Sequence, residues 1–303
     1  MTGTHSPTMT GPRARNGGRV PLHLLAGLAA FATLGMVGIA LAAPAAPTHD
    51  ATNIAVDVTM DARLGGLKFG SISMQAAFGD TAYTARSVVR TEGITDHVFR
   101  QVFDLTAAGA RTPDLMQTQN YQARNTDQDN IQLIDVNYLA DAAPLVAADP
   151  PYDNSDRVAP RPTDLKNTVD PLSAMIVPMA TPGPAACNRT IPVYDGRRRY
   201  DFKMTFDRMS DIQSNKGFSG AAARCDAILV PVSGYKRDTI MEMRRDPMPI
   251  TVWLGPVADA NVLVPVRIEV ATPLGTLVAH TTKFTVSKQA SGSGSSQAAL
   301  LAN

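Results

Sequence analysis

Residues 54–60, IAVDVTM, alternate apolar and polar side chains with a period of two. This is the pattern of a β-strand with one buried and one solvated face. Residues 67–78 and 83–89 continue in the same style. The pairs at 65–66 (GG) and 79–80 (GD) separate the three stretches and suit tight turns. The sequence therefore predicts a three-stranded antiparallel meander at the start of the domain.

Strand patterns continue towards the C-terminus, over residues 131–138, 190–194, 197–206, 227–232, 250–254, 262–271 and 277–286. Asp195-Gly196, between two of these stretches, is typical of a two-residue type I′ hairpin turn and marks both residues as structural. About ten short strands joined mostly by turns predict a mainly β fold. We expect a curved antiparallel sheet that forms a barrel or half-barrel, with a β-sandwich as the alternative.

Two short helices are expected within this β protein. Residues 94–105 carry apolar side chains at helical spacing, which indicates an amphipathic helix. A second helix of about two or three turns is expected at Asp170-Pro171, because Asp is a favoured N-cap and Pro suits the first helical position. Asp170 is therefore interpreted as a cap rather than a catalytic acid. Residues 142–162, rich in Ala, Pro and Asp, predict a long surface loop.

The N-terminus has the layout of a secretory leader. Basic side chains precede an apolar run over residues 22–41, and small residues follow it as ALAAPAA over residues 40–46. A signal peptidase recognises this arrangement, so we expect residues 1–45 to be a signal peptide. The run is also near the length of a membrane span, and an uncleaved anchor is the alternative. Neither an adjacent arginine pair nor a lipoprotein cysteine flanks the run, which indicates general secretion to the periplasm.

Composition limits the remaining chain to a folded, near-neutral protein. Leaving out Arg13, Arg15 and Arg19 of the leader, 25 basic residues stand against 27 acidic ones, a net charge of −2. Such a chain lacks the basic surface that binding to nucleic-acid phosphates requires, so nucleic acid is not an expected partner. We expect one β-rich domain over residues 50–287 and a disordered tail over residues 288–303, which is rich in Ser, Gly and Ala.

The residues that could carry chemistry are few. The only two cysteines, Cys187 and Cys225, favour a disulfide in an exported protein, with two buried thiols as the alternative. The histidines outside the leader, at positions 49, 97 and 280, are too far apart for ligand spacing, so we expect neither a metal nor a cofactor. Known nucleophile and phosphate-loop motifs are absent from the sequence, which favours a protein that is not an enzyme.

The densest polar group lies over residues 194–202, YDGRRRYDF. On a strand, Arg197 and Arg199 project from one face, and the planar fork of each guanidinium suits a carboxylate or phosphate. Arg197, Arg199 and Tyr200 are therefore the candidate ligand-binding residues. The alternative makes the arginines cross-strand partners of acids such as Asp207 and Asp226.

These motifs resemble the bacterial envelope family known as domain of unknown function 3108. The resemblance is carried by residues 170–174 (DPLSA), Cys187, residues 193–201 (VYDGRRRYD), Cys225 with the later Pro231 and Gly234-Tyr235, and residues 264–268 (VPVRI). It extends over residues 50 to 287. It implies a periplasmic β-rich fold and, because the family carries no assigned activity, makes an enzyme less expected.

The leading hypothesis for function is a non-enzymatic periplasmic module whose curved sheet binds an apolar or lipid-like ligand. One alternative is an envelope structural or assembly factor that binds other proteins by sheet-edge pairing. Another is a hydrolase that uses Asp170 or Asp201. An open apolar concavity favours the first hypothesis, a filled barrel with a long bare edge strand the second, and a cleft with convergent carboxylates the third.

Overall fold

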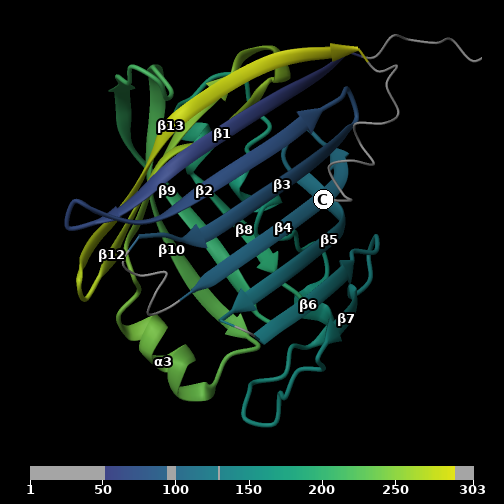
Figure 1. The fold of residues 1–303 in the computed structure, drawn as a ribbon. Helices are drawn as coiled ribbons and strands as arrows, with labels where there is room; N and C mark the ends of the chain where they lie inside the picture. The colour runs from purple at the N-terminus through teal and green to yellow at the C-terminus, as the bar shows by residue number, and fades with distance from the viewer. Residues whose placement is uncertain (1–51, 94–99, 129, 291–303) are drawn as a thin grey trace, which may run out of the picture. The chain divides into compact units, whose positions relative to one another are not determined.

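The structure is a computed structural model that describes residues 52–93, 100–128 and 130–290. These residues form one antiparallel sheet of 13 strands, in the order β7-β6-β5-β4-β3-β2-β1-β13-β12-β11-β10-β9-β8. The sheet curls so that β1–β7 face β8–β10 across the interior (Figure 1). Within the described residues, the edge strands β7 and β8 do not pair with each other. The mainly β, barrel-like class is therefore confirmed, and the barrel is not closed.

The predicted N-terminal meander is confirmed as β1–β3, and most of the later strands are longer than their sequence patterns. The first half of the sheet comprises β1 (Thr52–Leu64), β2 (Leu67–Phe78), β3 (Ala82–Thr91), β4 (Gln101–Arg111), β5 (Met116–Asp127), β6 (Asn130–Asn137) and β7 (Leu145–Asp149). The second half comprises β8 (Arg189–Tyr194), β9 (Arg199–Ile212), β10 (Gly220–Ser233), β11 (Ile250–Val257), β12 (Val262–Thr272) and β13 (Gly275–Ala290).

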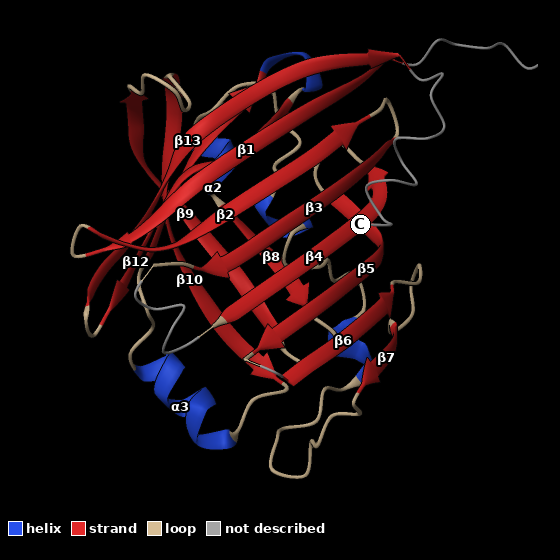
Figure 2. Cartoon of the chain, in the orientation of Figure 1, coloured by secondary structure: helices blue, strands red, loops and turns tan. Residues whose placement is uncertain are grey.

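Helical structure is sparse and short, as Figure 2 shows. It comprises α2 (Pro184–Cys187), α3 (Arg237–Arg245) and the 3₁₀ turns η1 (Pro162–Leu165), η2 (Ser173–Met175) and η3 (Ala258–Ala260). None of the helices in the described ranges has the length and apolar character needed to cross a membrane. The predicted signal peptide, residues 1–45, lies outside the described residues. So do residues 291–303 of the predicted tail, whereas residues 288–290 belong to β13.

Several sequence-based expectations are wrong. Residues 101–105 of the first predicted helix belong to β4, because pairing with both β3 and β5 prevails over the helical spacing; residues 94–99 lie outside the described ranges. The second predicted helix is reduced to the single turn η2. Strand β7 lies within the predicted loop at 142–162, and β5 and α3 were not predicted. Most side chains of β5 are polar, and its buried ones are Met116, Thr118, Tyr121 and Ala123, so the apolar alternation in its sequence is weak.

Residues 162–179, termed here the interior segment, occupy the space between the two halves of the sheet. Val169 N–H donates to Pro192 O, and Tyr194 N–H donates to Val169 O, which attaches the segment to β8. Val177 exchanges two backbone hydrogen bonds with Leu263 of β12. Leu172 and Ile176 are buried in the same apolar core as β1–β6. The segment therefore fills the centre of the curled sheet.

A second apolar core lies between β8–β11 and the end of the interior segment. It contains the predicted disulfide: Cys187 at the end of α2 and Cys225 in β10 lie at bonding distance, with their Cα atoms 5.3 Å apart. Both side chains are fully buried. The bond therefore joins the chain that leaves the interior segment to the middle of the sheet.

Replacing both Cys187 and Cys225 by Ala should lower the free energy of unfolding by up to about 4 kcal/mol, because the bond closes a loop over a sequence separation of 38 residues in the unfolded chain. Urea denaturation of the variant and of the oxidised protein measures the difference. The wild-type protein treated with a reductant is the control and should match the variant. Equal denaturation midpoints for oxidised and reduced protein would contradict this expectation.

Candidate functional site

The predicted ligand-binding arginines lie at the turn between β8 and β9. This turn has four residues, 195–198, and is closed by a hydrogen bond from Asp195 N–H to Arg198 O of 3.1 Å. The predicted two-residue type I′ turn is therefore wrong. β9 begins only at Arg199, so Arg197 is a turn residue and the two arginines do not share a strand face.

Asp195 and Gly196 both belong to this four-residue turn and do not form a two-residue turn of their own. The Asp195 carboxylate accepts hydrogen bonds from the N–H groups of Arg197 and Arg198, at 2.9 and 2.6 Å. Gly196 has a φ of 90°, and a Cβ at this position would lie 2.7 Å from a methyl group of Ile134 in β6. The turn can therefore pack against β6 only with glycine at this position.

Both arginines already have acceptors within the protein. Arg199 is 9% exposed and donates to Asp164 O at 2.9 Å and to the Asp201 carboxylate at 2.7 Å. The Arg197 guanidinium lies 4.4 Å from the centre of the Tyr152 ring and donates to Asn154 Oδ1 at 3.2 Å. The acids proposed as their cross-strand partners, Asp207 and Asp226, pair instead with Arg224.

Asp170 is fully buried in the interior segment and acts as a cap, as predicted. Its Oδ1 accepts hydrogen bonds from the N–H groups of Leu172 and Ser173, at 2.8 and 3.0 Å. Its Oδ2 accepts a 2.6 Å hydrogen bond from the hydroxyl of Thr118 in β5. Burial raises the pKa of Asp170, and these hydrogen bonds offset part of that rise. Pro171 follows in the same turn, which becomes η2.

Tyrosines lie near two carboxyl groups, the buried Asp170 and the partly buried Asp195. Burial is the main cause that raises the pKa of Tyr200, and the nearby negative charge of Asp195 raises it further. Burial likewise raises the pKa values of Tyr121 and Tyr138, and the Tyr138 hydroxyl donates to the backbone oxygen of Tyr194. This bond joins the chain after β6 to the edge strand β8. Tyr200 therefore lies in packed structure that holds the two edges together.

A hollow lies elsewhere, on the inner face near the turns of the β1–β2 and β12–β13 hairpins, and it is termed here the mouth pocket. Its volume is about 230 Å³. Ile72, Val89 and Phe103 are directly opposite one another on β2, β3 and β4 and form one wall. Ile268 and Leu277 of β12 and β13 form the facing wall. Most of the lining is therefore apolar and comes from both halves of the sheet.

Small residues create this space between the larger side chains. Ala62, Gly70 and Ala279 are aligned across β1, β2 and β13 and line the pocket. A Cβ on Gly70 would lie 2.4 Å from the backbone oxygen of Arg90, so the position requires glycine. A glycine within a strand pattern signals a close approach of another backbone or a ligand, and this was the available sequence signal for the pocket.

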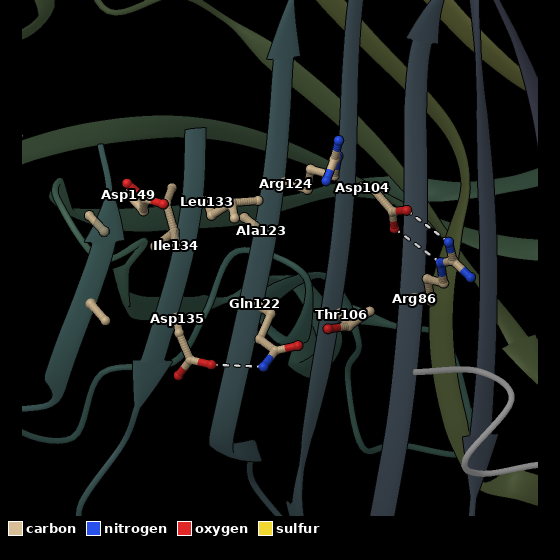
Figure 3. A pocket seen from close by; sticks show the side chains of 12 residues that line it. Arg86, Asp104, Thr106, Gln122, Ala123, Arg124, Leu133, Ile134, Asp135 and Asp149 are labelled. Carbon is tan, nitrogen blue, oxygen red and sulfur yellow. Dashed lines mark hydrogen bonds and ion pairs between the residues drawn. The ribbon is translucent and has the colours of Figure 1, made fainter. Parts of the chain in front are cut away.

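A second hollow of about 460 Å³ lies on the outer face of β3–β7. Figure 3 shows its polar side chains, four of which are paired with one another. The Arg86 guanidinium donates two hydrogen bonds to Asp104, at 3.0 and 2.7 Å, and Gln122 donates to Asp135 at 2.7 Å. These pairs cross neighbouring strands and stabilise the outer surface of the sheet.

The acids of the hydrolase hypothesis lie in different surroundings. Asp170 is buried and bound by hydrogen bonds within the core, whereas Asp201 is partly exposed and paired with Arg199. The described residues contain no group of three or more His, Cys, Asp or Glu side chains that could hold a metal ion. Of the two hollows described above, the mouth pocket has fewer polar side chains in its lining.

Replacing Asp170 by Asn should change how stability depends on pH. Burial raises the folded pKa of this carboxyl above its unfolded value, so the folded protein holds the proton more tightly. The stability due to that proton is full below the unfolded pKa and is lost as pH rises through the folded pKa. Asn does not ionise. The wild type should therefore lose stability relative to Asp170→Asn as pH rises from about 4, measured by urea denaturation at a series of pH values.

Asp61→Asn is the control for this measurement. Lys68 lowers the pKa of Asp61, so its stability contribution is present above the unfolded pKa and is lost as pH falls. The two variants should therefore give difference curves of opposite slope. A flat curve for Asp170→Asn would show that the two protonation states of Asp170 are equally favourable in the folded core.

Comparison with known proteins gives the family. The model of a protein of unknown function, DUF3108, matches residues 57–282, from β1 to β13. No curated protein matches the chain. Among solved structures, a beta-barrel-like protein of domain of unknown function DUF1849 from Brucella abortus matches with a TM-score of 0.45 and 12% identity, over 78% of this chain and 98% of that chain. Because the family match covers most of the sequence, the chain belongs to the DUF3108 family, as its motifs indicated.

Proposed function

We propose that this protein is an exported periplasmic module that binds an apolar or lipid-like ligand in the mouth pocket. The observation that carries the proposal is the apolar lining of that pocket, contributed by both halves of the sheet. Ile72, Phe103 and Leu277 are only partly buried without a ligand. Covering such side chains stabilises a complex by about 25 cal/mol for each Å² of apolar surface removed from water.

The space inside the curled sheet limits how much of a ligand can enter the mouth pocket. The interior segment fills the centre of the sheet, and the pocket lies near the turns of the β1–β2 and β12–β13 hairpins. Its volume of about 230 Å³ is smaller than the roughly 300 to 1,000 Å³ of sites that enclose a whole small molecule. The proposed ligand therefore inserts one apolar end and leaves its polar end outside. A lipid has both of these parts, an apolar end and a polar end.

Two features support the proposed location. The N-terminal sequence has the basic, apolar and small-residue regions of a secretory leader. The Cys187–Cys225 bond suits an oxidising compartment, in which disulfides form and persist. Both features agree with a ligand taken from the cell envelope.

A second candidate function rests on the edge strand β7. Leu145 of this strand is 61% exposed, and apart from its pairing with β6 the strand has no neighbour among the described strands. An extended segment of another protein could add to this edge by backbone hydrogen bonds. However, β7 has only five residues, so the edge offers few such bonds. The mouth pocket is therefore the stronger candidate.

Replacing Val89 by Trp should fill the mouth pocket and weaken binding of a dansylated fatty acid by at least about tenfold, because a tenfold loss corresponds to about 1.4 kcal/mol. Val88→Trp is the matched control. Val88 is the preceding residue of β3, is also partly buried and lies on the opposite face of the strand. Fluorescence titration gives the dissociation constants of both variants.

The proposal is wrong if the wild-type protein does not bind the probe, or if the two tryptophan variants bind it equally well. Mass spectrometry of lipid extracts from protein purified out of its native envelope then identifies the bound molecule. The same measurement on Val89→Trp should show that this molecule is lost, and the measurement on Val88→Trp should show that it is retained.

The same assay tests the predicted contact between the arginines and an anionic ligand group. Replacing both Arg197 and Arg199 by Ala should lower the melting temperature and leave the probe affinity unchanged, because both guanidinium groups already donate to protein acceptors. An unchanged melting temperature with weaker binding would instead assign these arginines to the ligand. Binding and melting are measured on the same protein sample.

A further inference from the structure

Two neighbouring hairpins carry exposed leucines at their turns. Leu67 follows the Gly65-Gly66 turn between β1 and β2, and its side chain is 72% exposed. Leu274 lies in the turn between β12 and β13 and is 84% exposed. Among the exposed large apolar side chains of the described residues, these two are the most exposed. Water therefore contacts most of the apolar surface of both side chains.

The two turns lie at the same end of the sheet. Leu64 of β1 is paired with Leu277 of β13, which aligns the last residues of the two hairpins. The Leu64 side chain also lies 3.9 Å from where a Cβ on Gly275 would be. In Figure 1 both hairpins project beyond the body of the sheet, and α3 lies near the same end. The exposed leucines therefore form one protruding feature.

Cations and further apolar side chains accompany this feature. Arg63 and Lys68 are on either side of the β1–β2 turn, with 43% and 40% of their side chains exposed; Arg63 pairs with Asp61, and Lys68 pairs with both Asp61 and Glu92. Met248 is 51% exposed, and the next residue, Pro249, accepts a hydrogen bond from Ala271 N–H near the end of β12. The acids offset these cations, so the exposed apolar side chains distinguish this feature, and such side chains are typical of segments that lie in the interface of a bilayer.

The mouth pocket begins immediately behind these leucines. Phe69 and Gly70 follow Leu67 on β2, and Leu277 follows Leu274 on β13; all three line the pocket. Any surface that contacts the two hairpin turns is therefore next to the pocket. An apolar chain could pass from that surface into the pocket with little exposure to water.

We propose that this end of the protein docks on a phospholipid membrane, with Leu67 and Leu274 inserted among the lipids and the mouth pocket facing them. The occupant is a membrane because two separate leucine-bearing turns project from the fold next to a pocket for an apolar chain. This inference deepens the proposed function and rests on it, since docking explains how a lipid-like ligand reaches the pocket.

The experiment uses the protein purified from the periplasm and vesicles of phosphatidylethanolamine with phosphatidylglycerol. Intact mass confirms that all variants have the same N-terminus. The test variant is Leu67→Ser with Leu274→Ser. The matched control is Leu133→Ser with Leu145→Ser, which removes two leucines that are 40% and 61% exposed on β6 and β7. Co-sedimentation measures the fraction bound to vesicles, melting temperature measures folding, and the dansylated fatty acid measures the pocket without vesicles.

The test variant should lose at least about tenfold in vesicle binding, because two inserted leucine side chains are removed. It should keep its melting temperature and its affinity for the probe. The control variant should bind vesicles like the wild type. In a second measurement, Leu67→Trp should show a blue shift of tryptophan emission on addition of vesicles, and brominated lipids should quench that emission.

Vesicle binding that survives in the test variant would overturn the docking proposal, and so would a wild type that does not bind vesicles. Self-association through the leucines without vesicle binding would also overturn it and would identify a second copy as the occupant. A pocket that does not bind the ligand gives a different result from a failure of docking. In that case the wild type binds vesicles but does not bind the fatty-acid probe in solution, which contradicts the proposed function alone.

Discussion

The buried carboxylate of Asp170 is the interaction on which the rest of this structure depends. A sheet whose two edge strands do not pair with each other does not stay curled by its own ladder of hydrogen bonds; among the described strands, β7 and β8 are not paired. The interior segment replaces that pairing. Asp170 ties this segment to Thr118 of β5 and at the same time orders its turn by accepting two backbone hydrogen bonds. A buried carboxylate is costly unless its oxygens are bound, and here both oxygens are.

The two sequence motifs that carry the family resemblance meet at this place. The residue before Asp170, Val169, pairs with Val193 at the start of the motif VYDGRRRYD. Asp195 orders the turn that follows, Gly196 allows it to pack against β6, and Arg199 donates to the backbone of the interior segment at Asp164. These motifs therefore have a physical role in holding the curled sheet together, and a catalytic role is not needed to explain them.

Filling the centre of the sheet restricts where a ligand can bind. The mouth pocket lies at the hairpin end, and small residues keep it open. There the same two hairpins provide the walls of the pocket and the exposed leucines beyond it. Stability is thus concentrated around the interior segment and the disulfide, while the surfaces proposed to bind lipid lie at the end of long strands. The side chains that line a pocket at this place can therefore differ without disturbing the contacts that keep the sheet curled.

The sequence by itself determined the β class, the N-terminal meander, the cap at Asp170, the turn residues Asp195 and Gly196, and the cysteine pair. Each of these depends on local chemistry: period-two alternation, side chains that bind their own backbone, or the pairing of two thiols. Only the tertiary structure decided that residues 101–105 form a strand, because pairing on both sides outweighs helical spacing. The partners of Arg197 and Arg199, and the walls of the mouth pocket, come from segments far apart in the chain, whose approach follows from how the whole sheet curls.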